Sequence, residues 1–523
     1  MVSSEMLLFK LRKSLIQVSK EEAKRCDAMH FQVLLALSCA ALILPVQGRN
    51  YVRGCYFTNW AQYRQAEGKY FPEDYEVGLC EYVFYAFAKL NSDFTVTNFE
   101  WNDIDRLYPA LMKFKKSQPD LKVLLSIGGW NAGTSVFKHL AQSFANRKKF
   151  IDSVVSFIRQ HNFDGLDLDW EYPDAADKAN YVALNKELHE RFIEEGKSNG
   201  SGKLYLTAAV SLDNAKVDAG YDAKELSKYW DFMNLMSYDV HGGWEMKTGV
   251  NSPLYPRSTD PEWAKYWNIA GSAIYWNWKG MPKEKIVIGL ATYGRGWTLA
   301  SMWNTGVDAV ATGPSTTSPY LGEAGVIAYY EICQRLATGG KRHWDHETKT
   351  PYLIYGNQWF TYDDEESIKY KLLWLMKEGY GGAFVWTLDY DDFKGTACKH
   401  NRGKKYPLVS LMKEMLSARD GDHLQGKNAS DVIDSKGYFE PTAVTTSKTA
   451  APVGSLTAHT PGISYGTFVC PSSFGYFEDP ASCNSFYQCS YGYPYKFACT
   501  LGLVWNPSTN SCDWPFNYYC EKL

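Results

Sequence analysis

One short run of the chain combines three carboxyl groups at a spacing of two residues. Asp167, Asp169 and Glu171 alternate with two leucines and a tryptophan. On a β-strand, residues i, i+2 and i+4 point to one face, so the carboxyl groups would project from one side of an apolar strand, about 6.6 Å apart at Cα. Carboxyl groups buried together cannot all ionise freely, so at least one pKa should rise. A carboxylic acid kept protonated near neutral pH suits a general acid.

The run from Asp164 to Glu171 has the pattern D-x-x-D-x-D-x-E. This pattern resembles the active-site strand of glycoside hydrolase family 18, the chitinases and chitinase-like proteins. The alternative is an acidic loop or a calcium site. A calcium loop would lack the alternating leucines and would carry a mid-loop glycine and more oxygen ligands. We therefore interpret the run as a catalytic strand, with Asp164 as a structural group at its start.

The length and composition of the chain limit the classes of protein to consider. Its 523 residues allow several domains, and an α/β barrel with insertions could use most of them. The net charge of −3 gives no indication of a nucleic-acid partner. Aromatic residues make up 15% of the chain, which is high. Aromatic surfaces bind the apolar faces of sugars, although a large core would also account for many of these side chains.

The cysteines indicate an oxidising compartment. Cys26 and Cys39 lie in the leader, and the other ten form an even set with six of them between Cys470 and Cys520. An even set behind a secretory signal indicates disulfides. The Cys-x-x-Cys spacing of zinc sites is absent from the sequence. The resemblance to glycoside hydrolase family 18 implies a mechanism that needs no metal and no cofactor.

An apolar run near the N-terminus predicts secretion. Phe31–Val46 is about 16 residues long, short of the roughly 20 that a membrane span needs. Small residues before Arg49 suit cleavage, so we expect a leader over 1–48 with a signal peptide at Met29–Gly48. The mature protein should be extracellular. If translation begins at Met1, the basic residues ahead of the run could instead make it an uncleaved anchor.

From Val52 to about Ser417, short β-rich runs alternate with longer helical stretches, which predicts βα units and a parallel sheet. A (β/α)8 barrel contains eight such units, and its catalytic residues lie at the C-terminal ends of the strands. Glu171 follows its strand, as that rule requires. The expected strands are Arg53–Phe57, Tyr82–Phe87, Val123–Ile127, Gly165–Trp170, Leu204–Val210, Phe232–Met236, Ile286–Leu290 and Gly382–Trp386.

The chain outside the eight units divides into three further parts. The gap between the last two strands predicts an α+β insertion over about 296–364, within a catalytic domain of residues 49–419. Residues 420–466 are rich in Ser, Thr and Pro and predict a linker. Residues 467–523 hold six cysteines, which suits a small domain that needs disulfides for stability.

The last 57 residues resemble the peritrophin-type chitin-binding domain. The phrases Phe486–Cys489, Gly502–Asn506 and Cys512–Pro515 carry this resemblance. A disulfide knot that binds something else is the alternative. Trp505 either stacks on sugar or belongs to the module's small core, and we slightly favour sugar contact. The two resemblances imply five disulfides, namely Cys55–Cys80, Cys333–Cys398, Cys470–Cys489, Cys483–Cys520 and Cys499–Cys512.

Four other segments match the family where barrel active sites are built. They are Ser126–Asn131, Met236–Asp239, Tyr293–Arg295 and Trp386–Asp389. With these segments in order, the chain is most similar to the animal chitotriosidase and acidic-chitinase group. The implied substrate-binding residues are Tyr56, Trp60, Gly128, Gly129, Trp130, Asn131, Met236, Asp239, Trp244, Tyr293, Arg295 and Trp386. For the aromatic residues, packing in the core is the alternative.

The resemblance implies hydrolysis with retention and assistance from the substrate. Glu171 would protonate the glycosidic oxygen, and the substrate's acetamido carbonyl would attack the anomeric carbon. Asp169 would hold the acetamide N–H, Asp167 would share a proton with Asp169, and Tyr238 would orient the acetamide oxygen. The expected partners are chitin and chitooligosaccharides, with no nucleic acid and no membrane. We expect a monomer.

Two other functions are consistent with parts of the sequence. Chitinase-like lectins keep the barrel but lose the acid, whereas Glu171, Asp167, Asp169 and Tyr238 are all present here. An endo-β-N-acetylglucosaminidase would trim glycoproteins, but a tethered chitin-binding module raises effective concentration only near chitin. The sequence therefore favours an endo-acting chitinase, with a catalytically weak chitin-binding lectin as the alternative.

Overall fold

The computed structural model describes residues 50–200, 202–417, 468–471, 474–490, 493–499, 503–507, 511–513 and 520. The expected signal peptide and the expected linker both lie outside these residues. None of the helices in the described residues is long and apolar enough to cross a membrane.

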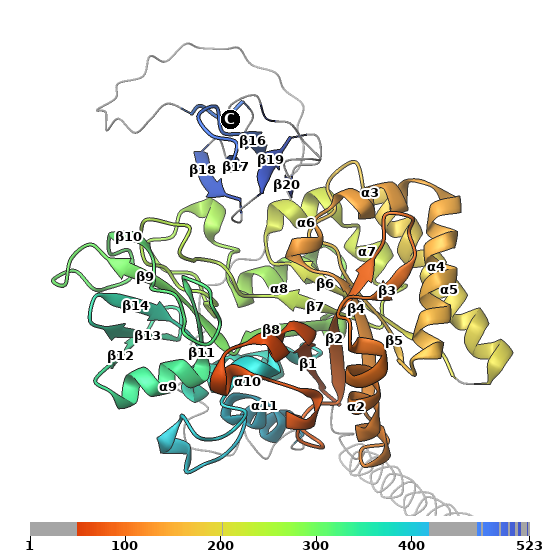
Figure 1. Cartoon of the computed structure of the whole chain (residues 1–523), viewed down its shortest axis with the longest axis horizontal. Helices are drawn as coiled ribbons and strands as arrows, with labels where there is room; N and C mark the ends of the chain where they lie inside the picture. Colours follow the sequence, from red (N-terminus) through yellow and green to blue (C-terminus); the bar gives the residue numbers. More distant parts are fainter. Residues whose placement is uncertain are drawn as a thin grey trace, which may run out of the picture. The chain divides into compact units, whose positions relative to one another are not determined.

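Eight parallel strands form a closed barrel (Figure 1). Their order is β1-β15-β8-β7-β6-β5-β4-β2, and pairing of β1 with β2 closes the ring. The expected (β/α)8 fold is therefore confirmed, and the largest difference is that β2 extends to Leu90 rather than Phe87. The strands are β1 (Val52–Thr58), β2 (Tyr82–Leu90), β4 (Lys122–Gly128), β5 (Gly165–Asp169), β6 (Tyr205–Ser211), β7 (Phe232–Met236), β8 (Ile286–Ala291) and β15 (Gly382–Trp386).

Helices and short connections cover the outside of the barrel (Figure 1). The segment between β1 and β2 holds only short 3-10 helices, beginning with η1 (Asn59–Tyr63), and β3 (Val96–Asn98) pairs antiparallel with β2. Ser143, Asp213, Asp222, Asn268 and Asp364 cap helix N-termini with their side chains. The helices are α2 (Tyr108–Met112), α3 (Ser135–Gln142), α4 (Phe144–Gln160), α5 (Lys178–Asn199), α6 (Asn214–Gly220), α7 (Ala223–Leu226), α8 (Ile269–Trp278), α10 (Glu365–Glu378) and α11 (Pro407–Ser417).

The expected insertion is an antiparallel sheet with one helix, α9 (Tyr329–Ala337). Its strand order is β10-β9-β14-β13-β12, and β11 pairs with β9. The sheet begins at Tyr293, because β9 follows β8 after Thr292, so Tyr293 and Arg295 belong to the insertion sheet. The strands are β9 (Tyr293–Leu299), β10 (Ala311–Pro314), β11 (Val326–Ala328), β12 (Lys341–Asp345), β13 (Thr350–Tyr355) and β14 (Gln358–Thr361).

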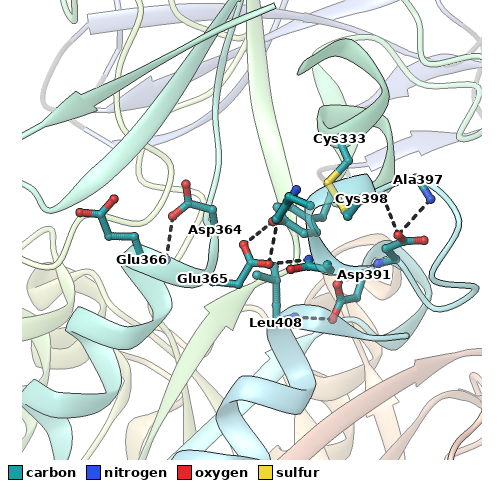
Figure 2. A network of polar contacts seen from close by, with 12 residues as sticks. Cys333, Asp364, Glu365, Glu366, Asp391, Ala397, Cys398 and Leu408 are labelled. Carbon is teal, nitrogen blue, oxygen red and sulfur yellow. Dashed lines mark hydrogen bonds and ion pairs between the residues drawn. A yellow bond between two sulfur atoms is a disulfide. The ribbon is translucent and has the colours of Figure 1, made fainter. Parts of the chain in front are cut away.

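Two buried aspartates follow β15: Asp391 binds the start of the last helix (Figure 2), and Asp392 binds the loop before it. Asp391 accepts hydrogen bonds from the N–H groups of Leu408 and Val409, both at 3.0 Å, in the first turn of α11. Asp392 accepts from three successive N–H groups, the last being that of Cys398 at 2.8 Å. These bonds satisfy backbone donors that a buried loop and a helix start would otherwise leave unpaired.

Five disulfides are present, with the pairings that the two resemblances imply. Cys55–Cys80 joins β1 to the start of β2, and Cys333–Cys398 joins α9 to the loop that Asp392 organises (Figure 2). The other three lie in the C-terminal module, whose strands are β16 (Phe474–Glu478), β17 (Ser485–Ser490), β18 (Tyr493–Ala498), β19 (Val504–Asn506) and β20 (Ser511–Asp513).

Candidate active site

Asp167 lies at the centre of the barrel with no exposed surface and accepts hydrogen bonds from four strands. Tyr56 (β1), Ser126 (β4) and Thr207 (β6) each donate a hydroxyl at 2.7 Å, and Asn234 (β7) donates its amide at 3.4 Å. The register explains the arrangement, because Ser126 and Thr207 are the direct neighbours of Asp167 on the strands beside β5. Burial raises the pKa of Asp167, and the four donors oppose that rise.

Asp169 and Tyr238 each carry a buried oxygen without a partner. The side chains of Asp169 and Tyr238 are 3% and 7% exposed. Among the described residues, Asp169 Oδ1 accepts no hydrogen bond, and the Tyr238 hydroxyl neither donates nor accepts one. Leaving such groups unpaired costs roughly 1–3 kcal/mol each, so the pair is suited to a polar ligand. No hydrogen bond joins Asp169 to Asp167 within the described part of the chain, and the oxygens of Asp167 accept from Tyr56, Ser126, Thr207 and Asn234 instead.

Burial raises the pKa of Asp169 well above its ordinary value, and the charges of Glu171 and Asp167 raise it further. Burial also raises the pKa of Glu171, to about 7. A hydrogen bond from Tyr172 and the positive charge of Lys216 lower the pKa of Glu171, while the charge of Asp239 raises it. Glu171 is half-buried just beyond the end of β5. A carboxyl group with this pKa can be protonated and deprotonated near neutral pH, as an acid–base catalyst requires.

Gly128 and Gly129 are needed for close contacts within the protein. A Cβ on Gly128 would lie 1.9 Å from the carbonyl oxygen of Asp169, and one on Gly129 would lie 2.6 Å from the ring of Phe87. Both residues also have a positive φ. The Gly129 N–H donates to the same Asp169 oxygen at 2.9 Å. The two glycines therefore allow close packing of the turn after β4 against Asp169 and Phe87, and their contact with substrate stays a prediction.

Trp386, at the end of β15, lies in a group of stacked and tilted rings. Its ring centroid is 5.1 Å from that of Tyr56, 6.2 Å from that of Trp60 and 6.0 Å from that of Phe87. Tyr56 is also fully buried against Phe84, at 4.7 Å. Trp60 and Trp386 are half-buried and so keep surface for a ligand, whereas Tyr56 contributes its hydroxyl to Asp167 and its ring to the core.

Asp239 is exposed and joins the loop after β7 to the insertion sheet. Its Oδ1 accepts from the Tyr293 hydroxyl at 2.5 Å and from Arg295 Nε at 2.8 Å. The Arg295 guanidinium lies over the ring of Trp244, 5.1 Å from the centroid, and Trp244 is 41% exposed. Four of the predicted substrate-binding residues are therefore in contact with one another.

The remaining predicted residues lie at the surface near strand ends. Trp130 is 57% exposed and Asn131 is also exposed, both in the turn after β4. Met236 is half-buried at the end of β7. Asp164 lies at the other end of β5, where it accepts the Val123 N–H at 2.7 Å, as expected for a structural group.

Sequence reasoning missed the partners of the carboxyl groups. Ser126, Thr207 and Asn234 are polar residues within apolar strands, and their alternation with core residues is the sequence pattern that could have identified them. Lys216 and Tyr172 influence the pKa of Glu171. Lys216 lies in α6, far from Glu171 in the sequence, and no motif marks it.

Trp505 differs from the expectation of sugar contact. Its side chain is 3% exposed and stacks on Phe486 with centroids 4.0 Å apart. The backbone N–H of Trp505 donates to the backbone carbonyl of the disulfide-bonded Cys483 at 2.7 Å. A module this small has few other large side chains to bury, so Trp505 belongs to its core.

Comparison with known proteins gives relatives along most of the chain. A "Probable endochitinase" of Caenorhabditis elegans is 49% identical over 376 residues, which is 70% of this chain and 60% of that protein. The chain therefore spans less than two thirds of that relative. An "Endochitinase" of Brugia malayi is 38% identical over 477 residues, which is 88% of this chain and 94% of that protein.

Solved structures resemble the barrel part of the chain. An immunomodulatory active chitinase from Trichuris suis is 62% identical, with a TM-score of 0.69 over 70% of this chain and all of the other. Human YKL-39, described as a pseudo-chitinase with retained chitooligosaccharide binding, is 40% identical, with a TM-score of 0.67 over 70% of this chain and all of the other. Residues 470–520 match the Chitin binding Peritrophin-A domain. Residues 52–391 match Glycosyl hydrolases family 18, and the chain belongs to that family.

Proposed function

We propose that the chain is a secreted, monomeric, endo-acting chitinase that hydrolyses β-1,4-linked N-acetylglucosamine with retention of configuration. The relatives named endochitinase and the match to the family support this reaction class. The carboxyl groups and aromatic side chains of the site suit the polar groups and apolar faces of such a sugar. The reaction needs no metal or cofactor.

The observation that carries the mechanism is the pair of unpartnered oxygens on Asp169 and Tyr238. The substrate's 2-acetamido group offers one donor and one acceptor. Its N–H would donate to Asp169 Oδ1, and its carbonyl oxygen would accept from the Tyr238 hydroxyl. Because both protein atoms are buried and unpaired, binding would remove two desolvation penalties and would hold the acetamide in one orientation.

Glu171 would supply the proton in the first step. The acetamido carbonyl oxygen attacks the anomeric carbon while the bond from that carbon to the glycosidic oxygen breaks, and the leaving oxygen takes the proton of Glu171. The resulting oxazolinium ion is cationic, and the Asp169 carboxylate would stabilise that charge. Asp167, fixed by its four donors, would add negative charge beneath Asp169.

In the second step, the ionised Glu171 would remove a proton from water. The water oxygen attacks the anomeric carbon, the bond from that carbon to the acetamide oxygen breaks, and the acetamide is restored. Two displacements at one carbon give net retention. A pKa of about 7 allows Glu171 to act as acid and then as base in one cycle. Trp386, Trp60 and Trp130 would bind the faces of successive sugars.

The C-terminal module would bind chitin and keep the barrel near an insoluble substrate. Its match to the Peritrophin-A domain supports this role. The sugar-binding surface would not include Trp505, which is buried.

The alternative is a lectin that binds chitin without cleaving it. The likeness to a pseudo-chitinase that retains chitooligosaccharide binding is the observation in its favour. The presence of Glu171 with a raised pKa favours catalysis. The test is an assay of the full chain, expressed in a secreting host, on a fluorogenic chitotriose, with Glu171→Gln as the matched variant.

Turnover by the wild type, with a loss of roughly 100- to 10,000-fold in Glu171→Gln, would support the enzyme. If the folded wild type binds chitooligosaccharide but shows no turnover between pH 3 and 8, the enzyme proposal is contradicted and the lectin alternative is supported.

A further inference from the structure

A short segment after β7, residues 250–252, lies against the residues that carry the site. Asn251 accepts the Asp239 N–H on its side-chain oxygen at 2.8 Å, and its backbone oxygen accepts the Val240 N–H at 3.0 Å. Ser252 donates its hydroxyl to the backbone oxygen of Ser237 at 2.7 Å. Tyr238 therefore lies between two residues whose backbone this segment holds.

Asp239 has a backbone conformation that needs such support. Its φ is 58°, in the left-handed region that residues other than glycine rarely adopt. The Asn251 oxygen fixes the Asp239 N–H in that conformation. The conformation in turn directs the carboxyl group toward Tyr293 and Arg295. Both residues donate hydrogen bonds to the same oxygen, Asp239 Oδ1.

The segment is itself anchored from the insertion side. The Asn251 N–H donates to the Thr361 hydroxyl of β14 at 3.2 Å, and Thr361 is the register partner of Arg295 in β9. Two hydrogen-bonded connections thus join Asp239 to the insertion sheet. One is direct, through Arg295, and the other passes through Thr361 and Asn251.

The second anchor is a buried ion pair. Lys371 of α10 has no exposed surface, pairs with Asp363 and donates to the Ser252 hydroxyl at 3.0 Å. Replacing a buried ion pair with apolar residues is often neutral or stabilising, so such pairs need a reason other than stability. Here the pair orients the Ser252 hydroxyl toward the Ser237 carbonyl.

We propose that Asn251 and Ser252 are positioning residues that hold Tyr238 and Asp239 in the geometry the reaction needs. Thr361 connects Asn251 to the insertion sheet, and Lys371 connects Ser252 to α10. This inference rests on the proposed function, because it assigns to the segment a role in the same site. Neither residue touches the substrate in this scheme, and both act through their neighbours.

The proposal has a readout that a general loss of stability would not change. The Asp239 charge raises the pKa of Glu171, whereas Lys216 and the Tyr172 hydroxyl lower it. If Asn251→Ala releases Asp239, its carboxylate moves and the pKa of Glu171 falls. The alkaline limb of kcat/KM then shifts to lower pH. Asp239→Asn, which removes the charge directly, should shift it in the same direction.

The experiment compares Asn251→Ala with Asn268→Ala in the full chain. Asn268 is equally buried, at 1% exposure, and also accepts one backbone N–H at 2.8 Å, but it caps α8, and in the part of the chain that the structure describes its side chain makes no hydrogen bond to Ser237, Tyr238 or Asp239. We expect Asn251→Ala to lower kcat/KM by roughly 10- to 100-fold and to shift the alkaline limb. Asn268→Ala should lower thermal stability without the shift. Equal pH profiles in the two variants would overturn the proposal.

Binding to the Glu171→Gln variant provides a test without turnover. Titration calorimetry with chitopentaose should show weaker binding when Asn251→Ala or Ser252→Ala is added, and unchanged binding when Asn268→Ala is added. Unchanged binding in all of them, together with unchanged kinetics, would contradict the positioning role. A wild type that binds but never hydrolyses would contradict the proposed function and leave the binding comparison valid.

Discussion

The hydroxyl of Tyr56 donates to Oδ2 of Asp167 at 2.7 Å, across 111 residues of sequence. This bond joins the first strand of the barrel to β5, which carries Asp167 and Asp169 and is followed by Glu171. It also favours the charged form of Asp167, whose pKa burial raises.

Tyr56→Phe should therefore affect the chemistry more than the fold. Loss of the bond raises the pKa of Asp167 further, so the acidic limb of kcat should move to higher pH, with roughly a tenfold loss of kcat at its optimum. Tyr85→Phe is the matched control, because Tyr85 donates to the buried Asp103 outside the site. pH–rate profiles of both variants check this, and identical profiles would count against it.

The raised pKa of Glu171 predicts how stability depends on pH. Its ordinary pKa is 4.5 and its value in the fold is about 7, so the unfolded chain ionises first. The contribution of Glu171 is fully present below pH 4.5 and is lost as pH rises toward 7. Glu171→Gln should remove this loss and be more stable than the wild type at pH 7, by up to about 3 kcal/mol. Thermal unfolding from pH 4 to 8 measures the difference; parallel curves would oppose the assignment.

Lys371 and Asp363 should show strong coupling in stability. Lys371→Met leaves the Asp363 carboxylate buried without its cation and should cost roughly 3–5 kcal/mol. The double variant Lys371→Met/Asp363→Leu removes both charges and should recover most of that loss. Urea unfolding of the four proteins in this cycle gives the coupling energy. Additive losses would show that the pair does not act as a unit.

Asp392 should be important for stability. Asp392→Ala leaves the N–H groups of residues 396–398 without their acceptor and should cost roughly 2–4 kcal/mol. Asp105→Ala, at an exposed position, should change stability by less than about 0.5 kcal/mol. Thermal unfolding compares the two. Equal unfolding midpoints for the two variants would mean that water takes the place of the Asp392 carboxylate as acceptor for these N–H groups.

The C-terminal module should matter only on solid substrate. Removal of residues 467–523 should weaken the action on insoluble chitin and leave kcat/KM on soluble oligomers unchanged, because tethering raises effective concentration only at a surface. Release of soluble sugar from chitin powder, measured beside oligomer hydrolysis, checks this. An equal loss on both substrates would show that the module instead supports folding of the barrel.

The sequence by itself determined the barrel and the strand that carries Asp167 and Asp169. Apolar strands buried on both faces and the two-residue spacing of Asp167, Asp169 and Glu171 are local patterns, so they could be read without a structure. The disulfide pairings came from the resemblance, since cysteine spacing alone leaves several connectivities open.

Only the tertiary structure decided which residues meet the carboxyl groups. Tyr56, Ser126, Thr207 and Asn234 come from four separate strands, and only the closed register brings them to Asp167. Packing likewise decided that Trp505 is buried and that Gly128 lies close against Asp169. Such contacts depend on long-range geometry, whereas a sequence pattern records only the preference of each residue for its own strand or helix.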